Sequence, residues 1–303
     1  MVTLTLSPAL DDSFTVDRLL PASKMRCSPA RTDPGGGGIN VARILHSLGE
    51  EAIAVFPLAG YLGQSLQHLL DLEGVATAPV PVTGETRQSH HVVDRETGLE
   101  YRFVLPGPNL PSQDQARCLE AVGRLAADAR YVVLSGSLPE GVPTSFVREV
   151  QEVAAYAGAR LVVDTSGKAL EAVSGAYLIK PSLRELEALV GAPLPQLEDQ
   201  VAGARDFLKR TDSSVMVISR GHRGVVVVTA DQAEAIPAPD TDVVNTVGAG
   251  DALVAGITAG LCRDWELGRA VRFGVACSVA MTGTMGTNLF TAHALSAFTD
   301  ELE

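Results

Sequence analysis

Asp251 stands where a glycine-rich turn meets an apolar run, in NTVGAGDALVAGITAGL at 245–261. The apolar residues that follow recur at helical spacing, which predicts a buried helix. The first N–H groups of such a helix lack intrahelical acceptors and suit an anion. A carboxylate beside them could accept a hydroxyl proton while the N–H groups of Gly248, Ala249 and Gly250 stabilise a transferring phosphoryl group. Alternatively, Asp251 only stabilises the N-terminus of its helix.

A second glycine-rich stretch, DPGGGGINVARILHSLG at 33–49, carries four consecutive glycines into another predicted helix. Glycine allows the backbone to approach a ligand closely, and four in a row cost too much chain entropy for an ordinary turn. Asn40, just inside the helix, could donate and accept hydrogen bonds with ligand hydroxyls. The stretch is therefore a candidate binding loop.

Two common nucleotide-binding patterns are absent from the sequence. No GxxxxGK[ST] string occurs, so a Walker A loop is excluded. The dinucleotide pattern GxGxxG fails after Gly248 and Gly250, because Leu253 stands where the third glycine belongs. An NAD-dependent oxidoreductase is therefore disfavoured.

The 303 residues carry a net charge of −12, with 46% hydrophobic and 20% charged residues. This composition is ordinary for a globular protein, and the charge argues against nucleic acid or an anionic membrane surface as main partner. The chain lacks a signal-peptide pattern and an 18-residue apolar run, so we expect a cytoplasmic protein. The four cysteines lie too far apart for a zinc site or a disulfide framework.

Short apolar runs alternate with helical patterns along most of the chain. The runs at 52–60, 131–137, 160–166, 176–182 and 214–220 are nearly continuous, which is typical of parallel strands buried on both faces. Helical patterns lie between them, and the segment from Gly250 to about Leu302 is mostly helical. These features predict one α/β domain over residues 1–303, a three-layer sandwich with a mainly parallel central sheet.

Two segments depart from this alternation. Residues 87–105 read as two strands joined by a polar turn at 95–98, and residues 12–30 are irregular and strand-like, with Pro21 and Pro29 interrupting them. Together they predict a small sheet outside the core, either a lid or a dimer contact. A simple hairpin decoration is the alternative.

The motifs GGGGINVAR and TVGAGD resemble the two signatures of the ribokinase-like (PfkB) family of sugar kinases. Further matches occur along the chain in the family's order and together cover nearly all of it: SPALD, KMRC, TRQ, YRFVLPG, SGSLPEG, KPSLREL and SRGHRG. The combination is most similar to the type-2 6-phosphofructokinases. The resemblance implies phosphorylation of fructose 6-phosphate to fructose 1,6-bisphosphate by ATP with Mg²⁺, in a homodimer formed through the lid. Tagatose-6-phosphate kinase and 1-phosphofructokinase share these motifs, and a non-catalytic sugar-phosphate sensor is a more distant alternative.

The same resemblance implies roles for individual residues. Asp251 would be the catalytic base and Gly248, Ala249 and Gly250 the anion hole. Positions that would hold the sugar are Asp11, Gly36, Gly37, Gly38 and Asn40. Positions that would hold its phosphate are Arg87, Arg102 and Ser137, and Lys24 and Arg26 would reach the ligand of a neighbouring subunit.

Matching positions for ATP are Lys180, Ser182, Glu185, Ser219, Arg220, Gly221, His222, Arg223 and Gly224. Glu185 would order waters around Mg²⁺, although Ser182 stands where the family usually has asparagine. Candidates for a monovalent cation such as K⁺ are Asn245, Val247, Thr284, Gly286 and Asn288. Asn245 replaces an aspartate of many relatives, but carbonyl oxygens alone can coordinate such an ion.

Overall fold

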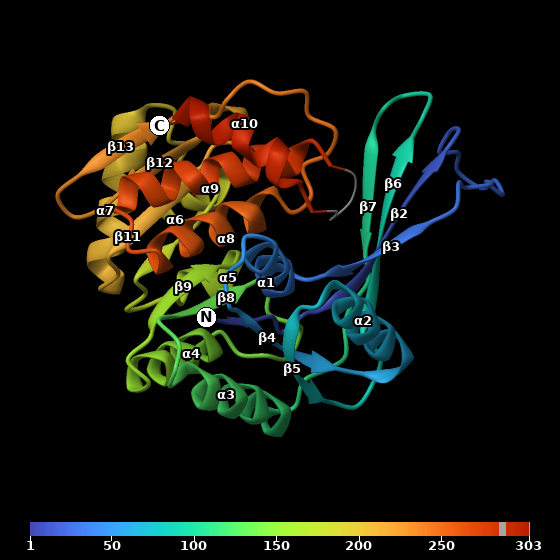
Figure 1. The fold of residues 1–303 in the computed structure, drawn as a ribbon, viewed down its shortest axis with the longest axis horizontal. Coiled ribbons are helices and arrows are strands. Elements are labelled where there is room, and N and C mark those ends of the chain that lie inside the picture. Colours follow the sequence, from blue (N-terminus) through green and yellow to red (C-terminus); the bar gives the residue numbers. More distant parts are fainter. Residues whose placement is uncertain (285–288, 303) are drawn as a thin grey trace.

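The computed structural model describes residues 1–284 and 289–302, and its core is a nine-stranded sheet of order β13-β12-β11-β10-β9-β8-β1-β4-β5 (Figure 1). Its strands are β1 (Val2–Leu4), β4 (Ile53–Leu58), β5 (Ala76–Pro81), β8 (Tyr131–Ser135), β9 (Arg160–Asp164), β10 (Leu178–Ile179), β11 (Val215–Ser219), β12 (Val225–Val228) and β13 (Ala233–Ile236). All neighbours pair in parallel except β11–β12 and β12–β13. All five apolar runs contain a strand, so the predicted mainly parallel sheet is confirmed.

The continuous apolar character of these strands follows from burial on both faces. Successive side chains of a strand point to opposite faces. In β8, Val132 and Leu134 join one core cluster, while Tyr131 and Val133 join the other. A half-exposed strand would alternate apolar with polar residues instead.

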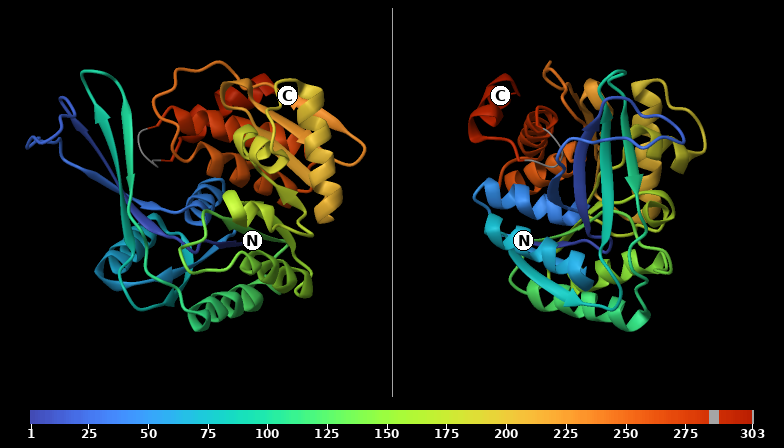
Figure 2. Two further views of the ribbon diagram at one scale, coloured as in Figure 1. Left: turned by 180° about the vertical axis from the view of Figure 1, so that it is seen from behind. Right: turned by 90° about the vertical axis from the view of Figure 1, so that its right-hand side faces the viewer.

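Helices cover both faces of the sheet, as Figures 1 and 2 show. One face carries α1 (Gly37–Ser47), α8 (Ala249–Cys262), α9 (Leu267–Thr282) and α10 (Ala292–Leu302). The other carries α3 (Ser112–Ala126), α4 (Ser145–Tyr156), α5 (Gly167–Glu171), α6 (Leu183–Val190) and α7 (Leu197–Thr211). The three-layer α/β architecture and the helical last third are thereby confirmed. No helix in the described ranges is long and apolar enough to span a membrane.

A four-stranded sheet of order β3-β2-β6-β7 projects from this body (Figure 1). It consists of β2 (Ala9–Val16), β3 (Arg31–Gly35), β6 (Arg87–Asp94) and β7 (Glu100–Val104). We call these four strands and the 17–30 connection the lid. The predicted strand pair within 87–105 is present as β6 and β7, antiparallel.

The N-terminal half of the lid is only partly as predicted for 12–30, since residues 12–16 belong to β2 but the rest of that segment does not form strand. Residues 17–30 form no strand, apart from an isolated bridge between Val16 and Cys27. The pairing strands lie on either side of that connection, over 9–16 and 31–35. The two prolines interrupt the intervening segment, since proline cannot donate a ladder hydrogen bond. The hairpin is therefore part of a larger sheet rather than a two-stranded decoration.

The one helix not yet placed, α2 (Gly60–Glu73), lies beside the base of the lid (Figure 1). Its Leu66 and Leu70 pack with Phe56 of β4, Leu10 of β2 and Ile39 of α1 in a third apolar cluster. This cluster fixes the start of the lid and the start of α1 against the body.

Candidate active site

Asp251 lies in the first turn of α8 and faces two other elements. Its Oδ2 accepts a hydrogen bond from Asn40 Nδ2 of α1 at 2.9 Å, and its Oδ1 accepts one from Ser135 Oγ of β8 at 3.4 Å. Burial is the main cause that raises the pKa of Asp251 to about 7, and the nearby Asp164 carboxylate adds to it. A group with this pKa can exchange a proton near neutral pH, which suits a general base.

A buried ion pair lies beside this carboxylate. Lys180 Nζ is 3.1 Å from an oxygen of Asp164, and Lys180 is 6% exposed. Burial, the largest single cause, lowers the pKa of Lys180, but the carboxylates of Asp164, Glu185 and Asp251 together raise that pKa above its ordinary value. The ammonium group therefore stays charged next to the turn, 3.5 Å from where a side chain at Gly250 would begin.

The glycines of both loops are needed for close packing. Gly248 caps α8 with φ 78°, a left-handed conformation that favours glycine, and a Cβ there would lie 2.9 Å from Met281 Cε. Gly36 caps α1 with φ 111°. A side chain at Gly37 would collide with Ser135, and one at Gly38 would lie 2.5 Å from Thr5 Oγ1. The two loops thus meet around Ser135 and Asp251.

Two of the three predicted phosphate-binding residues belong to the lid, Arg87 at its base and Arg102 in the middle of β7. Arg87 begins β6 and donates from Nη2 to the Ser7 carbonyl oxygen at 3.2 Å. Its Nε is buried and has no acceptor among the described residues. Arg102 of β7, Asp11 of β2 and Val247, next to the glycine turn, line one small pocket of about 20 Å³.

The charges in this region influence one another. Burial raises the pKa of Asp11, and Arg87 and then Arg102 oppose that effect. Burial, followed by repulsion from Arg102, lowers the pKa of Arg87, while Asp11 raises it. Asp33, the other carboxylate that acts on Asp11, is paired with Arg31 at 2.9 Å. The two remaining cations, Arg87 and Arg102, therefore outnumber Asp11, and this excess positive charge would favour an anion.

Three predicted residues stand apart from this cluster. Ser137 is exposed beyond β8, and no described contact joins it to either arginine. Lys24 and Arg26 are exposed on the 17–30 connection of the lid, and no described contact joins them to another site residue of the same chain. Their proposed reach to a neighbouring subunit remains a prediction.

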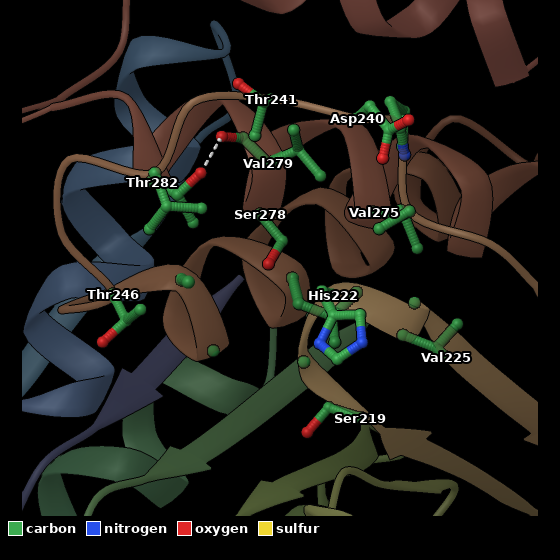
Figure 3. Close-up of a pocket in the computed structure, with 18 residues that line it drawn as sticks. Ser219, His222, Val225, Asp240, Thr241, Thr246, Val275, Ser278, Val279 and Thr282 are labelled. Atoms are coloured by element: carbon green, nitrogen blue, oxygen red, sulfur yellow. Dashed lines mark hydrogen bonds between the residues drawn. The ribbon is translucent and has the colours of Figure 1, made fainter.

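A pocket of about 290 Å³ opens on the other side of the glycine turn (Figure 3). Ala249 and Gly250 line it, together with four residues predicted to bind ATP: Ser219, Gly221, His222 and Gly224. In Figure 3 the His222 and Ser278 side chains project into the space between the labelled residues. Arg220 and Arg223 belong to the same 3₁₀ turn (η1, Gly221–Arg223, with Arg220 before it) but are not among the lining residues.

Ser182 and Glu185 form a capping box at the start of α6. Glu185 N donates to Ser182 Oγ at 3.3 Å, and Ser182 N and Oγ donate to Glu185 Oε2 at 2.7 and 2.8 Å. A serine is a favoured N-cap residue, so the replacement of asparagine keeps a stable helix start. Ser182 also pairs with Ser219 in an isolated parallel bridge, which links this cap to the nucleotide pocket.

The predicted cation residues that the structure describes are close together. Asn245 Oδ1 accepts from Val247 N at 2.6 Å, and Asn245 Nδ2 donates to the Thr284 carbonyl oxygen at 3.2 Å. An aspartate could not make the second bond, because an ionised carboxylate only accepts. Gly286 and Asn288 lie outside the described residues.

The comparison with protein families agrees with this geometry. The model of the pfkB family carbohydrate kinases matches residues 9–294. The chain belongs to this family. It is accordingly a carbohydrate kinase, and the resemblance found in its motifs is confirmed.

Several members of the family are similar over most of their length. The ATP-dependent 6-phosphofructokinase isozyme 2 of Mycobacterium tuberculosis is 43% identical over 95% of this chain and 85% of its own. The isozyme 2 of Escherichia coli is 38% identical over 95% and 94%. The 1-phosphofructokinase of Xanthomonas campestris is 35% identical over 92% and 89%.

The fold of this pfkB kinase matches solved structures as well. The Escherichia coli phosphofructokinase-2 in complex with fructose 6-phosphate has a TM-score of 0.93 at 35% identity, covering 100% of this chain and 98% of that one. The same enzyme has been solved in complex with potassium, with a TM-score of 0.93 at 36% identity, covering 100% of this chain and 98% of that one. Its tetrameric inhibited form has a TM-score of 0.92 at 36% identity, covering 99% and 98%.

Sequence reasoning assigned Lys180 to the site but missed two of its neighbours, Ser135 and Asp164. Ser135 ends β8, Asp164 ends β9 and Lys180 directly follows β10, and these strands are neighbours. The carboxyl ends of parallel strands are where α/β proteins bind ligands. Polar residues at those ends were the signal that could have found Ser135 and Asp164.

Proposed function

We propose that this pfkB kinase transfers the γ-phosphoryl group of ATP to fructose 6-phosphate and forms fructose 1,6-bisphosphate. The observation that carries the sugar-phosphate assignment is the buried Arg87 Nε without a described acceptor, beside Arg102. A buried donor left unpaired costs about 1–3 kcal/mol, so a ligand oxygen that accepts from it would be favoured. Arginine binds phosphate in a bidentate manner, which would orient the sugar.

The reaction follows from the positions of Asp251 and the α8 turn. The carboxylate of Asp251 takes the proton of the attacking sugar hydroxyl, whose oxygen bonds to the γ-phosphorus. The bond to the bridging oxygen breaks and ADP leaves. The N–H groups of Ala249 and Gly250, with Lys180 beside them, stabilise the negative charge on the transferring group.

ATP would occupy the pocket beside the glycine turn. Its apolar lining includes Val225, Leu253, Val275 and Val279, which suits a flat base. Ala249 and Gly250 lie at the border between this pocket and Asp251, where the terminal phosphate must be. The placement of base, glycine turn and pocket supports in-line transfer toward the lid.

The carboxylates near Lys180 fit a magnesium ion accompanying ATP. Asp164 and Glu185 are close enough that Glu185 contributes to the shifted pKa values of both Asp164 and Lys180. Mg²⁺ is usually held by one or two carboxylates together with phosphate oxygens and water. When bound, the ion neutralises phosphate charge.

A monovalent cation beside the turn is a further part of the proposal. The Escherichia coli enzyme has been solved with potassium. Here Asn245 already bonds the Thr284 carbonyl oxygen, so an ion would have to share or displace that contact.

Fructose 6-phosphate is expected to give the highest kcat/KM in an ADP-release assay on a panel of phosphorylated and free hexoses. Unphosphorylated fructose should be at least about 100-fold poorer, because Arg87 and Arg102 would be left without an anion. Fructose 1-phosphate and tagatose 6-phosphate in the panel test the two related activities. Equal turnover of free fructose would exclude the phosphosugar assignment.

We also propose that the lid forms a homodimer. Leu99, Phe103 and Leu105 share one face of β7 and its flanking residues and are between 46% and 56% exposed, and this strip is too small to form a core of its own. Sedimentation at micromolar concentration should show a dimer, and Phe103→Asp should shift it to monomer. Tyr156→Asp, at a 97% exposed position of α4, is the matched control. An active wild-type monomer would contradict lid pairing.

A further inference from the structure

Arg43 is the largest fully buried side chain described in the protein, and it is charged. It lies on α1 with 1% of its side chain exposed. Its Nε and Nη2 donate to the two carboxylate oxygens of Glu73, at the end of α2, at 2.6 and 2.7 Å. This fork-shaped pair satisfies one edge of the guanidinium group. The chemistry assigned above does not use it.

The other edge of Arg43 faces the active site. Nη1 donates to the Pro34 carbonyl oxygen at 3.1 Å and to Asn40 Oδ1 at 3.4 Å. Pro34 belongs to β3 of the lid, directly before the glycine loop. Asn40 is the residue whose Nδ2 donates to Asp251. One buried side chain therefore contacts α2, the glycine loop and the partner of the catalytic carboxylate.

These contacts fix which way the Asn40 carboxamide points. The group has one accepting oxygen and one donating nitrogen. Arg43 only donates, so the oxygen must face it and the nitrogen must face Asp251. A flipped amide would set two donors against each other at Arg43 and two acceptors against each other at Asp251.

We propose that Arg43, held by Glu73, is a positioning residue for phosphoryl transfer that keeps the Asn40 amide donating to Asp251. The inference rests on the proposed role of Asp251 as the base. Without Arg43 the amide can turn its oxygen toward Asp251, which disfavours the ionised carboxylate. The base would then be protonated over a wider pH range.

The groups that face Asp251 define what else could change its protonation. They are Asn40 of α1, Ser135 of β8, Asp164 of β9 and Lys180 after β10. The Asn40 bond and Lys180 favour the ionised form, and Asp164 opposes it. None of the residues exchanged in the experiment below belongs to this set, so a change in the pKa of Asp251 reports on the orientation of Asn40.

The experiment compares Arg43→Met with Arg263→Met. Arg263 also pairs with a glutamate, Glu50, at 2.7 Å and donates to the Leu48 carbonyl oxygen just after α1. It caps the end of α8 opposite to Asp251 and makes no described contact with Asp251 or Asn40. The first readout is the acidic limb of the kcat/KM pH profile, with whichever hexose phosphate the wild type uses best. Arg43→Met should move that limb up by about one pH unit, a tenfold change in the protonation equilibrium. Arg263→Met should leave it in place.

The second readout does not depend on the substrate. In protein labelled with ¹³C-aspartate, the carboxyl signal missing from Asp251→Asn identifies Asp251, and its titration should shift upward in Arg43→Met. If Arg43→Met fails to fold, Arg43→Leu also removes every donor at this position and should shift the titration in the same direction. An unchanged titration in a folded Arg43 variant overturns the proposal. An upward shift without hexose kinase activity would instead contradict only the proposed substrate.

Discussion

Asp251→Asn is expected to lower kcat by about 10²–10⁴-fold while ATP and fructose 6-phosphate still bind. The exchange is nearly isosteric and leaves an oxygen that can accept from Asn40 Nδ2. What disappears is the group that takes the proton of the attacking hydroxyl. Loss of a function needed only in the transition state lowers kcat with little change in ligand affinity. Steady-state kinetics and calorimetric binding on one purified variant measure both quantities.

The pH dependence of folding stability distinguishes a buried Asp251 that acts as a base from an Asp251 that only caps its helix. The pKa of Asp251 is about 7 in the folded protein, chiefly through burial, against an ordinary value of 3.8. Ionising this buried carboxyl therefore opposes folding, and the penalty grows as pH rises from about 4 to about 7. Asp251→Asn removes that penalty, so its melting temperature should exceed that of the wild type at pH 8 and not at pH 4.

Asp199→Asn is the matched control, since Asp199 is an exposed acidic residue in the first turn of α7. It shares the helix position of Asp251 without the burial or the proposed chemistry. We expect normal kcat and a small loss of stability from it, of the size of a dipole contact, about 0.3–1 kcal/mol. If Asp251→Asn behaves in the same way, Asp251 is structural and the mechanism is wrong.

The central architecture could be predicted because its signals are local and repeated. Strands β8, β9 and β11 are short apolar runs whose neighbours along the chain are amphipathic helices, as in "TSFVREVQEVAAYAG", which contains α4. The start of α8 carries its own glycine turn and acidic residue. Each of these patterns lies within about 15 residues, where periodicity and turn chemistry are strong guides.

The lid boundaries could not be predicted in this way, because pairing partners decide them. Arg31–Gly35 contains a proline and a glycine, which are poor strand formers. It becomes β3 because β2 offers it an antiparallel edge over 9–13. Such pairing is a tertiary effect that overrides local preference.

The electrostatic organisation of the site was also hidden from the sequence. Arg43 and Glu73 lie on different helices. Arg43 ends the GGGGINVAR motif, but nothing in the sequence pairs it with Glu73 or points it at Asn40. An arginine on an amphipathic helix ordinarily lies on its solvated face. Only the packing of α2 against α1 and the lid shows that Arg43 is buried and directed at Asn40.

Arg87→Ala is the second variant with a large expected effect. It should raise KM for the sugar phosphate by roughly 30- to 1,000-fold, which corresponds to loss of a buried charge-assisted contact of about 2–4 kcal/mol. KM for ATP should hardly change, because Arg87 lies at the base of the lid, whereas the nucleotide pocket lies across the α8 turn.

The ratio of kcat/KM for fructose 6-phosphate to that for fructose is the sharper measurement. Loss of a phosphate contact lowers only the numerator, whereas a distorted lid lowers both values and leaves the ratio unchanged. Arg95→Ala is the matched control on the same sheet: Arg95 lies in the β6–β7 turn, 59% exposed, and pairs with Asp17 at 2.6 Å. Exposed pairs contribute little, so this variant should resemble the wild type. If Arg87→Ala instead weakens ATP and spares the sugar, then the unpaired Nε serves the nucleotide. The anion between Asp11 and the two lid arginines would in that case be a phosphate of ATP rather than of the sugar.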